Sequence, residues 1–130
     1  MAEIQLQTEM HDELIINSWV FDDTFDWGNL SDKIISANEL INQNPDKRAY
    51  SIFLVNKIHR YPPDVISHLP TMSASTPPQV QIVIVVGKDS FVATLVDVFT
   101  RVFMQKIKLV STVEEARVVI AEHELKLSEI

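Results

Sequence analysis

The chain has 130 residues, of which 46% are apolar and 22% charged, a balance typical of one globular domain that buries its own core. It has no cysteine, which excludes disulfides, thiolate metal sites and cysteine nucleophiles. Its formal net charge of −7 argues against nucleic-acid binding and against adhesion to anionic membranes, because both need clustered lysine and arginine.

The first half of the chain predicts two strands, a helix and a third strand. Residues 3–9 alternate apolar with polar side chains, and residues 14–21 are rich in β-branched and aromatic ones. The short turn between these strands makes them antiparallel neighbours. Apolar residues recur at helical spacing over 27–42, and a third strand, with a continuous apolar run that marks it as buried, is predicted over 49–58. Three acidic residues before the helix are interpreted as capping residues: Asp22, Asp23 and Asp26.

The second half predicts two further strands and three helices. A short helix is expected from 63 to about 72, after a proline turn, and the most apolar strand spans 80–86. Residues 90–104 predict an unusually apolar helix, followed by a short strand at 107–110. The letters TVEE, at the start of 112–124, form a capping box that opens a last amphipathic helix.

The resulting order is ββαβαβαβα, which predicts a single α/β domain over residues 1–130 with its core at about 10–125. Strands that alternate with helices imply a mostly parallel sheet with right-handed crossovers, and the initial hairpin adds an antiparallel pair. The sequence begins without the basic and apolar regions of a signal peptide, and its apolar runs are too short to cross a membrane. We therefore expect a cytoplasmic protein.

The search for catalytic chemistry yields few candidates. No two histidines have the spacing of a helical metal site, and His11 and His123 are interpreted as solvated surface residues. No repeated glycines form a phosphate-binding loop, and no nucleophile elbow is present. We expect no catalytic residue, no metal and no cofactor. A weak ligand site is predicted where two strands end: Asn56, Lys57, His59, Tyr61, Gly87, Lys88, Asp89 and Ser90. The N–H groups at the start of the helix that follows residues 87–90 could hold an anion.

Four segments resemble the STAS domain superfamily, in particular its SpoIIAA-like branch. They are the strand SIFLVNKI at 51–58, the turn YPP at 61–63, the strand VQIVIVVG at 80–87 and the ending KLVSTVEEA at 108–116. The resemblance implies a four- to five-stranded sheet with helices mainly on one face. It also implies a regulatory, non-enzymatic module that binds proteins, or, in some family members, nucleotides or lipids.

One departure from the family pattern concerns regulation. Phosphorylated family members have an Asp-Ser type motif where the third strand passes into the second helix, and here Pro62 and Pro63 stand near that place. Proline has no hydroxyl group, so we do not expect the usual phosphorylation switch.

Three functions compete. The first is a protein-interaction module, self-associating as a homodimer through the apolar helix, with Phe91, Leu95, Val98, Phe99, Val102 and Phe103 as the interface. The second is a small-ligand sensor whose pocket is lined by aromatic side chains near strand ends: Trp19, Phe21, Phe53 and Tyr61. The third is an enzyme or carrier domain that uses Lys57, His59, Lys88 or Asp89. Of these, we expect the interaction module.

Overall fold

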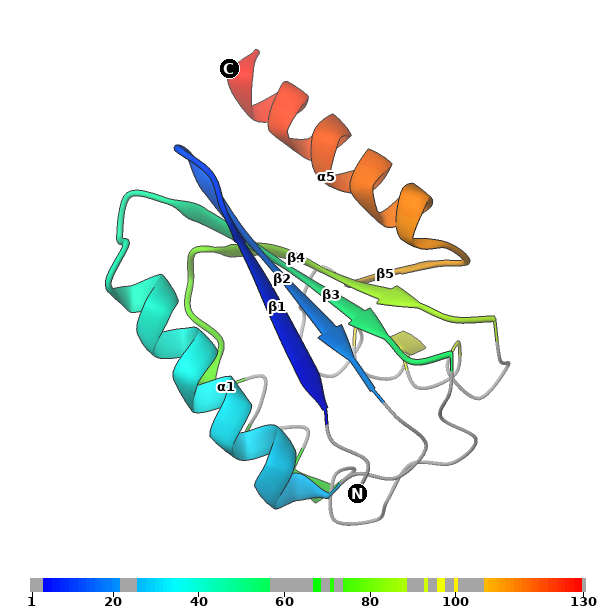
Figure 1. Ribbon diagram of the computed structural model, residues 1–130. Helices are drawn as coiled ribbons and strands as arrows, with labels where there is room; N and C mark the ends of the chain where they lie inside the picture. The colour runs from blue at the N-terminus through cyan, green and yellow to red at the C-terminus, as the bar shows by residue number, and fades with distance from the viewer. Residues whose placement is uncertain are drawn as a thin grey trace.

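The computed structural model describes residues 4–21, 26–56, 67–68, 71, 74–88, 93, 96–97, 100 and 107–129. Its centre is one five-stranded sheet in the spatial order of the sequence (Figure 1). The strands are β1 (Gln5–Met10), β2 (Leu14–Val20), β3 (Arg48–Leu54), β4 (Val80–Val86) and β5 (Ile107–Val110). β1 is antiparallel to β2, and every later neighbouring pair is parallel.

Two helices are described along their whole length, and both start at a side-chain cap. α1 (Trp27–Asn42) begins after Asp26, whose Oδ1 accepts a hydrogen bond from the Asn29 N–H at 2.8 Å. α5 (Val113–Ser128) begins after Thr112, whose Oγ1 accepts from the Glu115 N–H at 3.1 Å. The capping interpretation is confirmed for Asp26 and for the Thr112 half of the capping box.

The sheet is apolar on both faces, and α1 and α5 lie against opposite ones (Figure 1). Because side chains alternate along a strand, β2 and β3 each contribute to two cores. On the face toward α1, Trp19 and Phe53 of the sheet pack in one cluster with Leu30 of the helix. On the face toward α5, the strands contribute mainly aliphatic side chains, which pack with Ala116 and Ile120 of the helix.

The predicted mixed, mostly parallel α/β fold is confirmed, and the two helices add one detail to it. Helices mainly on one face stay a prediction, because only α1 and α5 are described in full, and α5 covers the face opposite α1. The physical reason is that Ile52, Ile84 and Val86 point away from α1 and need their own cover. Most of the predicted helices at 63–72 and 90–104 lies outside the described residues. Among the residues described, no helix is long and apolar enough to cross a membrane.

Candidate functional site

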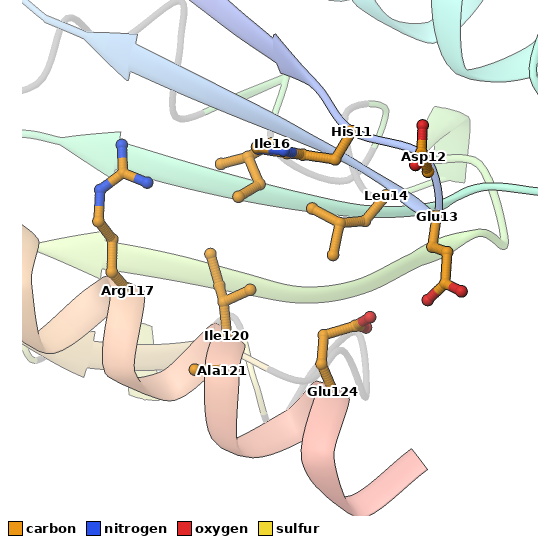
Figure 2. Close-up of a pocket in the computed structure, with 9 residues that line it drawn as sticks. All are labelled: His11, Asp12, Glu13, Leu14, Ile16, Arg117, Ile120, Ala121 and Glu124. Atoms are coloured by element: carbon orange, nitrogen blue, oxygen red, sulfur yellow. The ribbon is translucent and has the colours of Figure 1, made fainter. Parts of the chain in front are cut away.

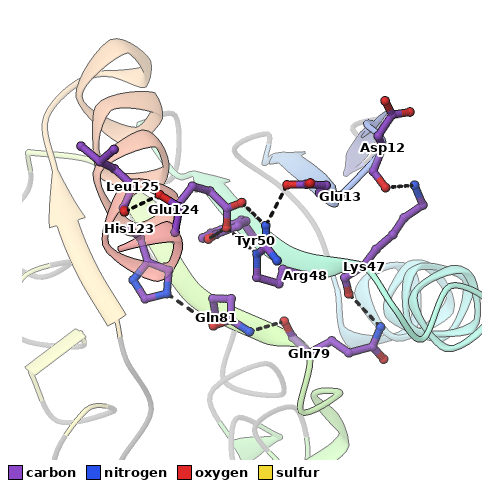
Figure 3. Close-up of polar contacts among 11 residues, drawn as sticks. Asp12, Glu13, Lys47, Arg48, Tyr50, Gln79, Gln81, His123, Glu124 and Leu125 are labelled. Atoms are coloured by element: carbon purple, nitrogen blue, oxygen red, sulfur yellow. Dashed lines mark hydrogen bonds and ion pairs between the residues drawn. The ribbon is translucent and has the colours of Figure 1, made fainter. Parts of the chain in front are cut away.

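Glu124 on α5 is the centre of a polar cluster above the start of β3 (Figure 3). Arg48 donates from Nε to Glu124 Oε2 at 2.8 Å and from Nη2 to Oε1 at 2.5 Å, the two-pronged pairing that these groups favour. The hydroxyl of buried Tyr50 donates to the same Oε2. Alternation along β3 puts Arg48 and Tyr50 on the face toward α5, so one carboxylate receives both.

The charges of this cluster are fixed at neutral pH. Hydrogen bonding from Arg48 lowers the pKa of Glu124 from its ordinary 4.5, although burial acts in the opposite direction. Burial raises the pKa of Tyr50, and its hydrogen bond to Glu124 raises this pKa further. The hydrogen bond to Glu124 also raises the pKa of Arg48. The cluster is therefore an ion pair with a neutral phenol, and none of its pKa values is moved toward neutrality, where proton transfer is most effective.

A second ion pair joins α5 to β1. Arg117 donates from Nη2 to Glu9 Oε2 at 2.7 Å and from Nη1 to Glu9 Oε1 at 3.4 Å. This hydrogen bonding lowers the pKa of Glu9. The ring of His11 is close to the same carboxylate, with Nε2 at 3.7 Å from Oε1, and its side chain is exposed. β1 and β5 are the two edge strands of the sheet, and α5 follows β5 in the chain. The pair therefore connects α5 to the edge of the sheet opposite β5.

A hollow of about 480 Å³ lies between α5 and the turn that joins β1 to β2, and we call it the hairpin–α5 groove (Figure 2). Its floor is apolar and consists of Leu14, Ile16 and Ile120. Its rim is mostly polar and consists of His11, Asp12, Glu13, Arg117, Ala121 and Glu124. The volume is within the range of pockets that bind small-molecule ligands.

The turn that forms one wall of the groove is fixed by hydrogen bonds from Lys47 and Arg48. Lys47 Nζ donates to the backbone oxygen of His11 at 2.5 Å. It also donates to the backbone oxygen of Asp12 at 3.0 Å (Figure 3). Gln79 Nε2 in turn donates to the Lys47 oxygen at 3.0 Å. The backbone N–H of Arg48 donates to the Glu13 oxygen at 3.0 Å. These bonds tie the turn to β3 and to the residue before β4, so the groove has a defined shape.

The opposite flank of α5 borders a second hollow, of about 420 Å³. Its lining includes Lys108, Lys126 and Glu122. It also includes His123, which we expected to be solvated. That interpretation is wrong, because His123 is half-buried: its ring meets the Tyr50 ring edge-on, with centroids 5.9 Å apart, and its Nε2 is 3.4 Å from Gln81 Oε1.

The described part of the predicted ligand site is at the other edge of the sheet. Asn56 follows β3, whereas Gly87 and Lys88 follow the adjacent parallel strand β4. The Gly87 N–H donates to the Val110 oxygen at 3.0 Å. Asn56, Gly87 and Lys88 are thus brought to the same carboxyl edge. The remaining predicted ligand residues lie outside the described part of the chain: Lys57, His59, Tyr61, Asp89 and Ser90.

The proposed interface residues also lie outside the described part of the chain: Phe91, Leu95, Val98, Phe99, Val102 and Phe103. The same holds for Pro62 and Pro63, where the phosphorylation motif was sought. Val96, from the same predicted helix as the interface residues, is described and packs against the core cluster on the α1 face.

Three of the four predicted aromatic residues do come together. The Trp19 and Phe53 rings are stacked, with centroids 5.6 Å apart and planes at 20°, and Phe21 is 5.7 Å from Phe53. Trp19 is 3% exposed, and its Nε1 is buried without a hydrogen-bond partner among the described residues. An unpaired buried N–H is uncommon in proteins, because its lost hydration is not replaced.

Sequence reasoning missed the groove and the Glu124 cluster. Glu124 is 74 positions from Tyr50 and 76 positions from Arg48 in the sequence, and no local pattern encodes such contacts. One signal was available: alternation places Arg48 and Tyr50 on one face of a buried strand, and a buried phenol requires an acceptor. The predicted ligand site lies at the carboxyl ends of the strands, whereas the groove lies beside the amino ends of β2 and β3.

Comparisons with known proteins bear on the fold. No family model matches the chain, and no curated protein matches it. A search of solved structures finds an uncharacterised protein of the DUF3478 family from Shewanella loihica PV-4, described as having a SpoIIAA-like fold. The two superpose with a TM-score of 0.71 at 6% sequence identity, over 89% of this chain and 92% of the other. The fold of this chain is SpoIIAA-like. The predicted resemblance is thereby confirmed at the level of the SpoIIAA-like fold.

Proposed function

We propose that the chain is a non-enzymatic interaction module that binds a segment of a partner protein in the hairpin–α5 groove. The observation that carries the proposal is an apolar floor beneath polar groups that are already paired. Leu14, Ile16 and Ile120 offer methyl groups, while Arg117 and Glu124 are held in fixed ion pairs. Preformed sites of this kind bind with little loss of side-chain freedom.

A catalytic role is disfavoured by how the groups of the groove are used. Glu124 accepts from both Arg48 and Tyr50, and Glu9 accepts from Arg117. Each carboxylate has its pKa lowered by these bonds, so neither is suited to abstract a proton at neutral pH. The same bonds hold α5, which forms one wall of the groove, against β1 and β3.

A matched pair of substitutions on α5 tests the proposal. Ala121 is exposed and lines the groove, whereas Val118 is 54% exposed and does not line it. We expect Ala121→Trp to fill the groove and Val118→Trp to leave it open. Proteins captured from native extract by the unmodified chain are purified and titrated against all three chains. The proposal requires a direct binder that is lost with Ala121→Trp and kept with Val118→Trp.

Two results would contradict it. If every purified binder tolerates Ala121→Trp, binding occurs elsewhere on the molecule. If no captured protein binds the unmodified chain directly, the interaction role itself fails. Circular dichroism of both variants ensures that a loss of binding is not a loss of folding.

Small-ligand sensing is a second candidate, and one observation favours it. The buried Trp19 N–H has no partner among the described residues and lies beside the stacked ring of Phe53. An acceptor oxygen on an aromatic or acyl ligand would satisfy this N–H. Native mass spectrometry of the purified chain tests the idea. A bound mass that is absent from Trp19→Phe supports it, and a chain that carries no added mass argues against it.

Self-association through residues 90–104 stays a prediction. Sedimentation analysis over a wide concentration range tests it, and a strict monomer at the highest concentration excludes it.

A further inference from the structure

The cations around the hairpin–α5 groove are already used within the molecule. Arg117 is paired with Glu9, and Arg48 with Glu124, each through two hydrogen bonds. Lys47 directs its ammonium group to two backbone oxygens of the turn. An incoming anion would have to displace one of these bonds, so the groove offers an acidic segment no prepared site.

Two carboxylates of the turn are less completely paired than these cations. Asp12 is exposed, and its carboxylate has no hydrogen bond or ion pair with any residue that the structure describes. The side chain of Glu13 is 79% exposed, and its carboxylate accepts a hydrogen bond of 3.5 Å from Arg48 Nη2, which also donates to Glu124 Oε1 at 2.5 Å. Both side chains project from the rim of the groove (Figure 2). One guanidinium thus serves two carboxylates, those of Glu13 and Glu124, so the turn with Asp12 keeps a net negative charge.

Below this rim the chemistry changes from charged to apolar. Leu14 directly follows Glu13 and is half-buried, and Ile120 faces it from α5 (Figure 2). A segment that placed a cation near Asp12 and Glu13 would therefore bring its next side chain over methyl groups. One apolar residue between two cations fits this arrangement.

We infer that the groove receives a positively charged partner segment in which an apolar side chain stands between lysines or arginines. The inference rests on the proposed function and specifies the chemistry of the partner at the same site. The net charge of −7 on the whole chain acts in the same direction, because it attracts basic segments and repels acidic ones. Charge complementarity of this kind contributes more to selectivity than to affinity.

Two synthetic peptides test the inference: Gly-Ser-Gly-Lys-Leu-Lys-Gly-Ser-Gly and its Glu-Leu-Glu counterpart, with both ends blocked. Each is titrated into isotopically labelled protein at low salt while amide signals are followed by NMR. We expect the lysine peptide to shift the signals of residues 12–14 and 117–121, and the glutamate peptide to leave them unchanged. Raising the salt from about 20 to about 200 mM should weaken the binding several-fold.

The matched control separates local from global charge. Asp12→Asn with Glu13→Gln removes two charges at the groove, and Asp32→Asn with Glu39→Gln removes two exposed charges on α1. We expect about tenfold weaker binding of the lysine peptide for the first pair and less than about twofold for the second. Equal loss in both pairs overturns the inference, since net charge alone would then explain binding.

Other outcomes separate the inference from the proposed function. If neither peptide shifts the groove signals, or if the glutamate peptide shifts them more, the inference fails. A direct partner that is lost only with Ala121→Trp would still support the proposed function in that case. If no such partner exists, the proposed function fails whatever the peptides do.

Discussion

The two faces of the sheet are held by different means. On the face toward α1, Trp19, Phe21 and Phe53 form an aromatic cluster, and the Trp19 N–H has no hydrogen-bond partner among the residues that the structure describes. On the face toward α5, aliphatic packing is joined by polar side chains that satisfy one another, with Glu124 accepting from Arg48. One alternating sequence thus produces a face stabilised mainly by apolar contact and a face positioned by directional bonds. The difference indicates that the α5 face has the fixed geometry that recognition needs.

The largest expected effect is on the aromatic face. Trp19→Ala removes a buried, stacked indole and leaves a cavity, so we expect the free energy of unfolding to fall by about 4 kcal/mol. Urea unfolding followed by circular dichroism measures this change. A loss below about 1 kcal/mol would mean that the face is not held by packing. Ile35→Ala on the exposed side of α1 is the control, with an expected change below about 0.5 kcal/mol.

The polar face should show a pH-dependent effect of intermediate size. Glu124→Gln weakens the pairing with Arg48, and we expect a loss of about 2 kcal/mol at pH 7. Because the pKa of Glu124 is lower in the folded state, its contribution is full above its ordinary pKa of 4.5 and disappears as the pH falls through its folded pKa. The stabilities of the two proteins should therefore converge as the pH falls below 4.5 and through the folded-state pKa of Glu124. A pH-independent difference would contradict an ionised Glu124 as the cause.

A smaller effect is expected from the phenol alone. Tyr50→Phe keeps the buried ring and removes only the hydroxyl that donates to Glu124, so the loss should be about 1 kcal/mol. The double variant with Glu124→Gln should lose less stability than the sum of the two single losses, since both substitutions change the same bond. Strict additivity in a double-mutant cycle would show that the two groups do not interact.

The smallest effect is expected at the exposed ion pair. Glu9→Gln disrupts the bond to Arg117, which is about half exposed, so solvent screening should limit the loss to about 0.5 kcal/mol or less. Thermal unfolding at low and moderate salt measures it. A loss as large as that of Glu124→Gln would mean that the pair, and not the Glu124 cluster, holds α5 on the sheet.

Local patterns predicted most of the fold. The helix at 27–42 and the strands at 80–86 and 107–110 have the predicted bounds, because period and capping chemistry are encoded within a few residues. The last helix extends further than predicted, to Ser128, since the residues after 124 include no glycine or proline that would end it earlier. The first strand is shifted toward Met10 by its pairing with Ile15 of β2.

The candidate site could not be predicted in the same way. Its walls come from the turn at His11 and from α5, and a one-dimensional pattern does not show which helix face meets which strand. The sequence correctly predicted that Trp19 and Phe53 lie close together, because both stand near the ends of neighbouring apolar strands. It gave Glu124 no role, because a carboxylate on an amphipathic helix usually faces solvent.

The ion pair between Glu9 and Arg117 joins residues 108 positions apart, and this separation has a consequence for the order of folding. Contacts of such long range form slowly, because a long loop must be closed before they stabilise the chain. The groove is thus absent from any intermediate in which α5 has not docked. A partner that binds the groove would select chains whose folding is complete, and by mass action it would slow the detachment of α5. Hydrogen exchange along α5, with and without a bound segment, would measure this coupling directly.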